Sequence, residues 1–151
     1  MKRLRIVLSV LLVGVMLWTV PMIKETYSYS KSSTKYWSKY YNKPVRKVVK
    51  KRIKLYFYTN LPEENGGYNG TAMGKFTSKT VCNNYYKLGR NLYIEGYGKK
   101  RVEDRGSSAF NSSNVFDVYI KRKSGESRSA YKRRVNNMGV KYKTAYIIYF
   151  K

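Results

Sequence analysis

The side chains available for chemistry are few, because the 151-residue chain contains no histidine and a single cysteine, Cys82. Ser-His and Cys-His catalytic pairs, histidine-ligated zinc and thiolate clusters are therefore excluded. Acid–base chemistry is left to a small number of carboxylates. Asp117 has the most unusual position of these, inside the apolar stretch of residues 115–119.

A strand over this stretch determines what Asp117 can do. Because the side chains of a strand alternate between two faces, Asp117 shares its face with Val115 and Tyr119 and is either fully exposed or held in a cleft. A cleft with apolar neighbours raises the pKa of a carboxyl group towards the range that a general acid needs at neutral pH. An ordinary exposed aspartate is the alternative interpretation.

The remaining candidates have simpler interpretations. Asp104 ends a predicted strand, and Glu63 and Glu64 precede an Asn-Gly-Gly sequence that is typical of a solvated loop. Glu126 falls in the first turn of a predicted helix, where a carboxylate complements the helix dipole. Cys82 has no histidine to lower the pKa of its thiol, so we expect a small buried side chain rather than a nucleophile.

The elements that position these residues are mostly short strands. A helix is predicted over residues 126–138, where Tyr131, Val135 and Met138 share one face and Ser124 can cap the start. Many short strands with one late helix favour a mainly β fold built as a small mixed barrel. The strands are predicted, from short β-like runs bounded by Gly, Asn or Ser, at residues 53–58, 80–82, 92–95, 101–104, 115–120 and 142–150.

The N-terminus predicts export. Residues 6–23 carry no charge, are rich in aliphatic side chains and follow the basic residues Lys2, Arg3 and Arg5. This pattern predicts a hydrophobic helix within residues 1–23 that acts either as a cleaved signal peptide or as an uncleaved membrane anchor. We therefore expect the rest of the chain at the extracellular face of the cell envelope, anchored or secreted.

The composition is strongly cationic, with 32 basic against 8 acidic side chains and a formal net charge of +24. Such a charge favours polyanionic partners. Outside a cell these are mainly anionic wall polymers and lipid head groups, so binding of nucleic acid is the least favoured of the three.

Residues 24–54 read as a basic linker rich in Tyr, Ser and Lys, which leaves residues 55–151 as the folded domain. Val45, Val48, Val49 and Ile53 have a helical spacing, so a short amphipathic helix on a membrane or wall surface is an alternative for the end of this linker.

Five short motifs in the domain resemble the 3D domain, a family named for three aspartates, and the similarity covers residues 58–149. This family is similar to the catalytic barrel of membrane-bound lytic transglycosylase A and to stationary-phase survival proteins. The resemblance implies a small six-stranded double-psi β-barrel. The motifs are Thr71-Ala72-Met73-Gly74, Leu88-Gly89, Leu92-Tyr93-Ile94-Glu95-Gly96-Tyr97-Gly98, Val102-Glu103-Asp104-Arg105-Gly106 and Phe116-Asp117-Val118-Tyr119.

The resemblance also implies an activity and a site. Asp117 matches the third aspartate and is implied as the catalytic acid, with Asp104, the second, beside it, whereas Cys82 stands where the family has its first. The implied reaction is non-hydrolytic cleavage of the MurNAc-GlcNAc bond of peptidoglycan glycan strands, with no metal and no cofactor. A non-catalytic, expansin-like wall-binding barrel is the alternative, favoured by the change at Cys82. The substrate-binding residues implied within the matched motifs are Thr71, Gly74, Tyr97 and Arg105.

Overall fold

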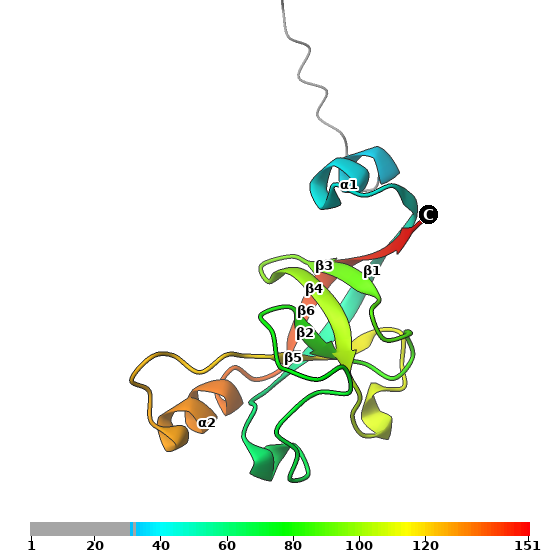
Figure 1. Ribbon diagram of the computed structural model, residues 1–151. Coiled ribbons are helices and arrows are strands. Elements are labelled where there is room, and N and C mark those ends of the chain that lie inside the picture. The colour runs from blue at the N-terminus through cyan, green and yellow to red at the C-terminus, as the bar shows by residue number, and fades with distance from the viewer. Residues whose placement is uncertain (1–30, 32) are drawn as a thin grey trace, which may run out of the picture.

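Six strands close into a barrel in the computed structural model, which describes residue 31 and residues 33–151 (Figure 1). The strands follow one another around the barrel in the order β1-β5-β2-β4-β3-β6. Two α-helices, α1 (Thr34–Tyr41) and α2 (Arg128–Asn136), and two 3-10 turns, η1 (Pro62–Glu64) and η2 (Ser108–Phe110), complete the described part. The strands are β1 (Val45–Tyr58), β2 (Thr80–Cys82), β3 (Asn91–Ile94), β4 (Gly98–Asp104), β5 (Val115–Tyr119) and β6 (Lys141–Phe150).

The barrel mixes parallel and antiparallel neighbours. β1 is parallel to β5 and β2 is parallel to β4, whereas β5 pairs antiparallel with β2, and β3 pairs antiparallel with both β4 and β6. One face of each strand points into the barrel and supplies the core, as expected for alternating side chains. The core comprises Ile53, Leu55, Val81, Tyr86, Leu92, Ile94, Val102, Phe116, Val118, Ala145 and Ile147.

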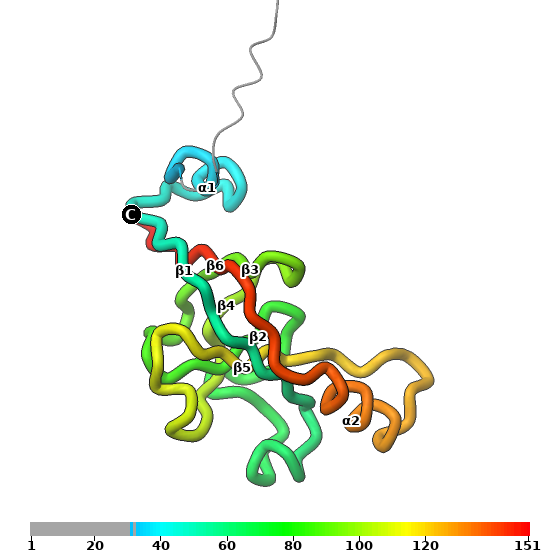
Figure 2. Tube along the Cα trace, turned by 180° about the vertical axis from the view of Figure 1, so that it is seen from behind, coloured from blue at the N-terminus to red at the C-terminus, as the bar shows by residue number. Residues whose placement is uncertain are grey.

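β1 is the longest strand and runs from one end of the molecule to the other. Its first half pairs with the end of β6, from Val45 opposite Phe150 onwards, and only its second half also pairs with β5. Helix α1 packs on this two-stranded ribbon through Trp37, which is fully buried. Figures 1 and 2 show α1 and the C-terminus together at one end, with the loop between β1 and β2 at the other.

The start of the folded domain corrects the predicted boundary. Residues 34–41 form a helix and residues 45–54 belong to β1, so the linker predicted for 24–54 is wrong over these residues. The amphipathic helix considered for the same stretch is also wrong: Val45 and Ile53 are buried because the strand pairs with β6, a partner almost a hundred residues away. The predicted signal peptide or anchor lies outside the described residues. No helix among residue 31 and residues 33–151 is long and apolar enough to cross a membrane.

The other elements agree with the sequence pattern. Each of the six predicted strands overlaps an observed one, and the mainly β barrel is confirmed. The predicted helix is α2, two residues shorter at each end than expected. Ser127 rather than Ser124 caps it, by accepting a hydrogen bond from the backbone N–H of Ala130.

Candidate active site

The two predicted catalytic acids lie on the outer face of the barrel, in one row across neighbouring strands. Cys82 of β2 is the Cα partner of Asp117 on β5 and of Asp104 on β4. The residues next to Asp117, Phe116 and Val118, point into the core. Asp117 therefore points outward, and Cys82 stands between the two carboxylates.

A register shift brings Asp104 to this face. Val81 is opposite Val102, but the next residue, Cys82, is opposite Asp104, so β4 holds one residue more than β2 at this point. In a regular strand Asp104 would share the inward face of Val102. The extra residue, Glu103, turns Asp104 outward instead, which is how bulges commonly re-aim side chains near active sites.

Two loops build a cleft of about 930 Å³ over this row. The loop between β1 and β2 forms one wall, and the loop between β4 and β5 forms the other. Three carboxylates, one thiol and three aromatic rings line the space, so its walls combine polar and apolar groups. The lining residues are Tyr58, Glu64, Asn65, Gly66, Tyr68, Asn69, Gly70, Thr71, Ala72, Cys82, Asp104, Arg105, Gly106, Ser107, Phe110 and Asp117.

Asp117 has the environment of a protonated acid. Its Oδ1 atom is buried and has no hydrogen-bond partner within the described part of the chain. The pKa of this carboxyl is raised to about 7, mainly by burial and further by the charges of Asp104 and Glu64, against a partial offset from the backbone N–H of Val118. A group with this pKa is available in both protonation states near neutral pH.

Asp104 is held in place by three donors. The hydroxyl of Tyr58 donates to Oδ2 at 2.9 Å, while the backbone N–H groups of Ala72 and Arg105 donate to Oδ1 at 3.1 Å and 2.9 Å. Burial and the neighbouring charge of Asp104 raise the pKa of the Tyr58 hydroxyl, so it remains a donor. These contacts fix the Asp104 carboxylate at the side of the cleft that faces Asp117.

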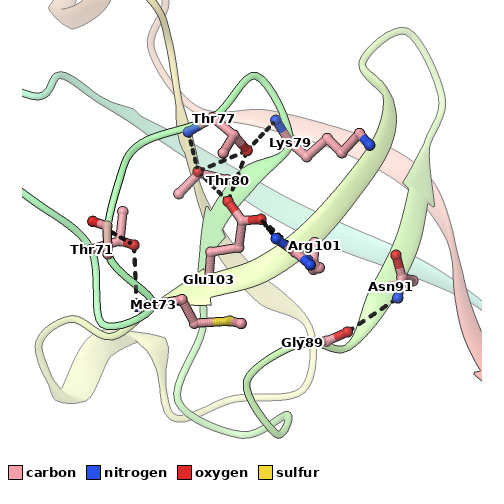
Figure 3. Close-up of polar contacts among 10 residues, drawn as sticks. Thr71, Met73, Thr77, Lys79, Thr80, Gly89, Asn91, Arg101 and Glu103 are labelled. Carbon is pink, nitrogen blue, oxygen red and sulfur yellow. Dashed lines mark hydrogen bonds and ion pairs between the residues drawn. The ribbon is translucent and has the colours of Figure 1, made fainter.

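The wall that supplies Ala72 is tied to the barrel by Glu103 (Figure 3). The Oε2 atom of the buried carboxylate accepts hydrogen bonds from the hydroxyls of Thr77 and Thr80, and its Oε1 atom contacts both Nε and Nη2 of Arg101 at 2.6 Å. Its backbone carbonyl accepts from the N–H of Met73 at 3.0 Å. Burial raises the pKa of Glu103, but the donors from Thr80, Thr77 and Arg101 outweigh it and lower the pKa overall.

Glu64 is a cleft residue that the sequence pattern assigns to a solvated loop, and that interpretation is wrong for this side chain. The 3-10 turn η1 separates it from Glu63, which pairs with Arg128 at the surface. Glu64 is instead half-buried, accepts a hydrogen bond from the Thr59 hydroxyl and lies 3.4 Å from the ammonium of Lys132 on α2. No local signal distinguishes the two glutamates, since their positions depend on the turn and on α2.

Cys82 is buried, as expected from the sequence. Burial and then the charges of Asp104 and Asp117 raise the pKa of its thiol to about 12, so it stays neutral. The β4–β5 loop closes tightly over the sulfur: a Cβ atom at Gly106 would lie 2.7 Å from Sγ, which explains the need for glycine there.

The four residues implied as substrate-binding fall in different places. Thr71 and Arg105 line the cleft, but the Arg105 guanidinium donates to the backbone carbonyls of Asn83 and Tyr86. Gly74, at φ +106°, forms a turn in which its carbonyl accepts from the N–H of Thr71, and it does not line the cleft. Tyr97 lies outside the cleft as well.

Tyr97 packs against the barrel core instead, with its ring centroid 5.5 Å from that of Phe57.

Among the described residues, no group of three or more Asp, Glu or Cys side chains is arranged to hold a metal ion. No protein-family model and no curated protein matches the chain. The assignment of a reaction therefore depends on the geometry of the cleft: a partly protonated carboxyl, a second carboxylate fixed beside it, and space for an extended polar substrate.

Proposed function

We propose that this protein is a lytic transglycosylase of the bacterial cell envelope, which cleaves the MurNAc-GlcNAc bond of peptidoglycan and leaves a 1,6-anhydro end. The observation that supports this most is Asp117: an outward, buried carboxyl whose pKa is raised to about 7 and whose Oδ1 has no partner in the described part of the chain. A glycosidic oxygen needs such a proton donor to leave.

Asp117 performs both proton transfers. In the protonated state it gives its proton to the glycosidic oxygen as the bond to the anomeric carbon of MurNAc breaks through an oxocarbenium-like state. The resulting carboxylate then removes the proton from the C6 hydroxyl of the same sugar, whose oxygen closes on the anomeric carbon. The first proton leaves with the new GlcNAc hydroxyl and Asp117 regains one from the C6 hydroxyl, so no water is consumed and one acid is sufficient.

Asp104 and Glu64 tune this acid. Both charges raise the pKa of Asp117, because a second negative charge nearby disfavours its ionisation. Asp104, fixed by its three donors, is also placed to accept a hydrogen bond from a sugar hydroxyl. The aromatic rings of Tyr58, Tyr68 and Phe110 line the cleft and provide surfaces for stacking on sugar rings.

The fold and the location belong to the same proposal. The barrel is of the double-psi type implied by the resemblance to the 3D domain, and the two parallel pairs, β1–β5 and β2–β4, support it. The position of Cys82 in the row between Asp104 and Asp117 supports its assignment to the family's first aspartate position. The export signal predicted within residues 1–23 supports a location outside the cell, where wall polymers and lipid head groups are the available polyanions.

The test is product formation from purified peptidoglycan. The full chain, Asp117→Asn and Glu126→Gln are each incubated with glycan strands, and the muropeptides are analysed by mass spectrometry. Glu126 is a matched control because it is a carboxylate paired with Arg134 and does not line the cleft. We expect 1,6-anhydro ends from the full chain and from Glu126→Gln, and a decrease of at least about 100-fold with Asp117→Asn. Equal activity of all three would exclude Asp117 as the acid.

A wall-binding barrel without catalysis is the second candidate, and Cys82 is the observation that favours it. A neutral thiol between Asp104 and Asp117 replaces a charge that the family resemblance implies. This candidate predicts retention on peptidoglycan with no anhydro product from any variant. Retention that is unchanged in Asp117→Asn and absent for a chain with a mutated cleft wall would support it.

A further inference from the structure

The end of the molecule opposite the cleft is strongly cationic. It consists of α1, the first residues of β1, the last residues of β6 and the side chain of Lys99, whose ammonium donates to the carbonyl of Tyr40. We name this surface the cationic pole. Residues 33–47 contain five Lys or Arg and no acid. The basic residues of the pole are Lys31, Lys35, Lys39, Lys43, Arg46, Lys47, Lys99 and Lys151.

Aromatic rings lie directly beneath these cations. The ammonium of Lys99 is 4.4 Å from the ring centroid of Tyr40, and that of Lys43 is 4.8 Å from the ring centroid of Phe150. Tyr40 is itself 37% exposed. Lysines above tyrosines are the combination that suits a membrane–water interface, where ammonium groups meet phosphates and amphipathic rings sit at the level of the head groups.

The pole is held as a rigid surface. Trp37 is fully buried within α1, with ring centroids 5.2 Å from those of Tyr93 and Tyr146 on the barrel. The hydroxyl of Tyr146 in turn donates to Glu95 on the barrel side of this cluster. The helix therefore holds the backbone of its lysines in fixed positions, so docking on a charged surface orders no further backbone.

We propose that the cationic pole docks on an anionic phospholipid bilayer and thereby points the cleft away from the membrane. The length of β1 gives the distance between the pole and the cleft, because its first residue, Val45, follows α1 and its last residue, Tyr58, lines the cleft. Fourteen residues of strand span roughly 46 Å. A docked barrel thus holds Asp117 well outside the head-group layer, on the side where glycan strands lie.

The chain before α1 favours lipid over a soluble polymer as the partner. The apolar stretch predicted to enter the membrane ends at residue 23, and ten residues of chain reach at most roughly 35 Å. An anchored protein therefore has its pole near the bilayer at a high effective concentration. This argument rests on the location given in the proposed function, whereas the binding itself is measured independently of any reaction.

The experiment follows hydrogen exchange in the full chain, reconstituted in vesicles of phosphatidylglycerol or of phosphatidylcholine. We expect backbone amides of residues 33–47 to exchange at least about tenfold more slowly on phosphatidylglycerol, with the difference lost at high salt. Two variants lose four positive charges each. The pole variant is Lys39→Gln, Lys43→Gln, Arg46→Gln and Lys47→Gln, and the matched control, changed at exposed positions on the opposite side of the barrel, is Lys121→Gln, Arg122→Gln, Arg133→Gln and Lys141→Gln.

The possible outcomes distinguish an anionic lipid bilayer from a wall polymer as the partner of the pole. Protection that is lost in the pole variant and kept in the control supports docking, provided that core amides of β2 and β5 exchange alike in both, which shows intact folds. Equal protection on both lipids, or an unaffected pole variant, overturns it. Protection by soluble poly(glycerol phosphate) and none by phosphatidylglycerol vesicles also overturns it and assigns the pole to a wall polymer. The pole variant should keep its activity on soluble glycan fragments, so a missing product bears on the proposed function alone.

Discussion

The two ends of β1 are built on opposite principles. At its N-terminal end, aromatic rings pack edge-on or tilted around Trp37, and lysines lie over the outer rings of Tyr40 and Phe150. At its C-terminal end, Asp104 and Asp117 lie in a cleft under two loops that are held mainly by hydrogen bonds. The first arrangement stabilises the fold through buried area, whereas the second keeps an ionisable group where burial disfavours its charge.

This difference keeps the proposed docking surface apart from the proposed catalytic acid. Cations close to Asp117 would lower its pKa and remove the proton that the proposed reaction needs. The basic residues between positions 35 and 47 lie at the end of β1 away from the cleft, while Arg105 at the cleft wall directs its guanidinium to the Asn83 and Tyr86 carbonyls. A net charge of +24 is thus compatible with an acid of pKa about 7.

The largest effect on stability is expected at the pole. Trp37→Ala removes a fully buried indole from the contact between α1 and the ribbon of β1 and β6. We expect the free energy of unfolding to fall by about 3–5 kcal/mol, as for other large-to-small core changes. Urea denaturation followed by tyrosine fluorescence measures this loss. A decrease below about 1 kcal/mol would mean that α1 is not part of the cooperative unit.

The elements that the sequence predicts are those with local causes. The strand at residues 80–82 and helix α2 follow from alternation, turn residues and capping, which a short window contains. The first half of β1 was not predictable in this way. Its sequence, with adjacent valines and repeated Lys and Arg, lacks strict alternation, and it becomes a strand because β6 pairs with it.

The residues of the candidate site also differ in whether the local sequence predicts where they lie. Asp117 was predictable, since a lone acid inside an apolar strand is visible in the sequence. Asp104 points outward only because of the register shift beside Glu103, and Glu64 enters the cleft only because η1 and α2 place it there. Both placements depend on long-range packing. Asp104 was expected at the site only through the resemblance to the 3D domain, and Glu64 was not expected there.

A smaller effect, which depends on pH, is expected from Asp117 itself. Its pKa rises from 3.8 in the unfolded chain to about 7 in the fold, so the folded state binds the proton more tightly. The stabilising contribution of the Asp117 proton is therefore fully present below about pH 4. It is lost as the pH rises to about 7, which lowers the free energy of unfolding by up to about 4 kcal/mol. Asp117→Asn should abolish this decline and be more stable than the unmodified chain at about pH 8. Identical pH profiles of the two proteins would contradict the buried acid.

Glu103→Gln tests whether the cleft depends on its polar network. The change weakens the contact with Arg101 and leaves fewer acceptors for Thr77 and Thr80. We expect a loss of about 1–3 kcal/mol in stability. Anhydro product should also decrease, because the loop that carries Ala72 is held to β4 partly by the bonds from Thr77 and Thr80 to the Glu103 carboxylate, and weaker bonds loosen this loop beside Asp104.

The control for this change is Glu95→Gln, since Glu95 lies outside the cleft and accepts one hydrogen bond from Tyr146. A positioning role predicts that kcat falls for Glu103→Gln while the pKa of Asp117 stays near 7. If activity falls only in proportion to the unfolded fraction, Glu103 stabilises the fold and does not position Asp104.

The smallest expected effect separates two adjacent glutamates. Glu64→Gln removes a negative charge that raises the pKa of Asp117, so this pKa should fall by a few tenths of a unit, on the order expected for a partly screened charge. Glu63→Gln is the matched control, because Glu63 pairs with Arg128 at the surface and leaves the cleft unchanged. A carbon-13 titration of the aspartate carboxyls gives both values, and the alkaline limb of the rate profile should move to lower pH for Glu64→Gln alone. Equal shifts in the two variants would show that Asp117 responds to the net charge of the β1–β2 loop rather than to the carboxylate that lines the cleft.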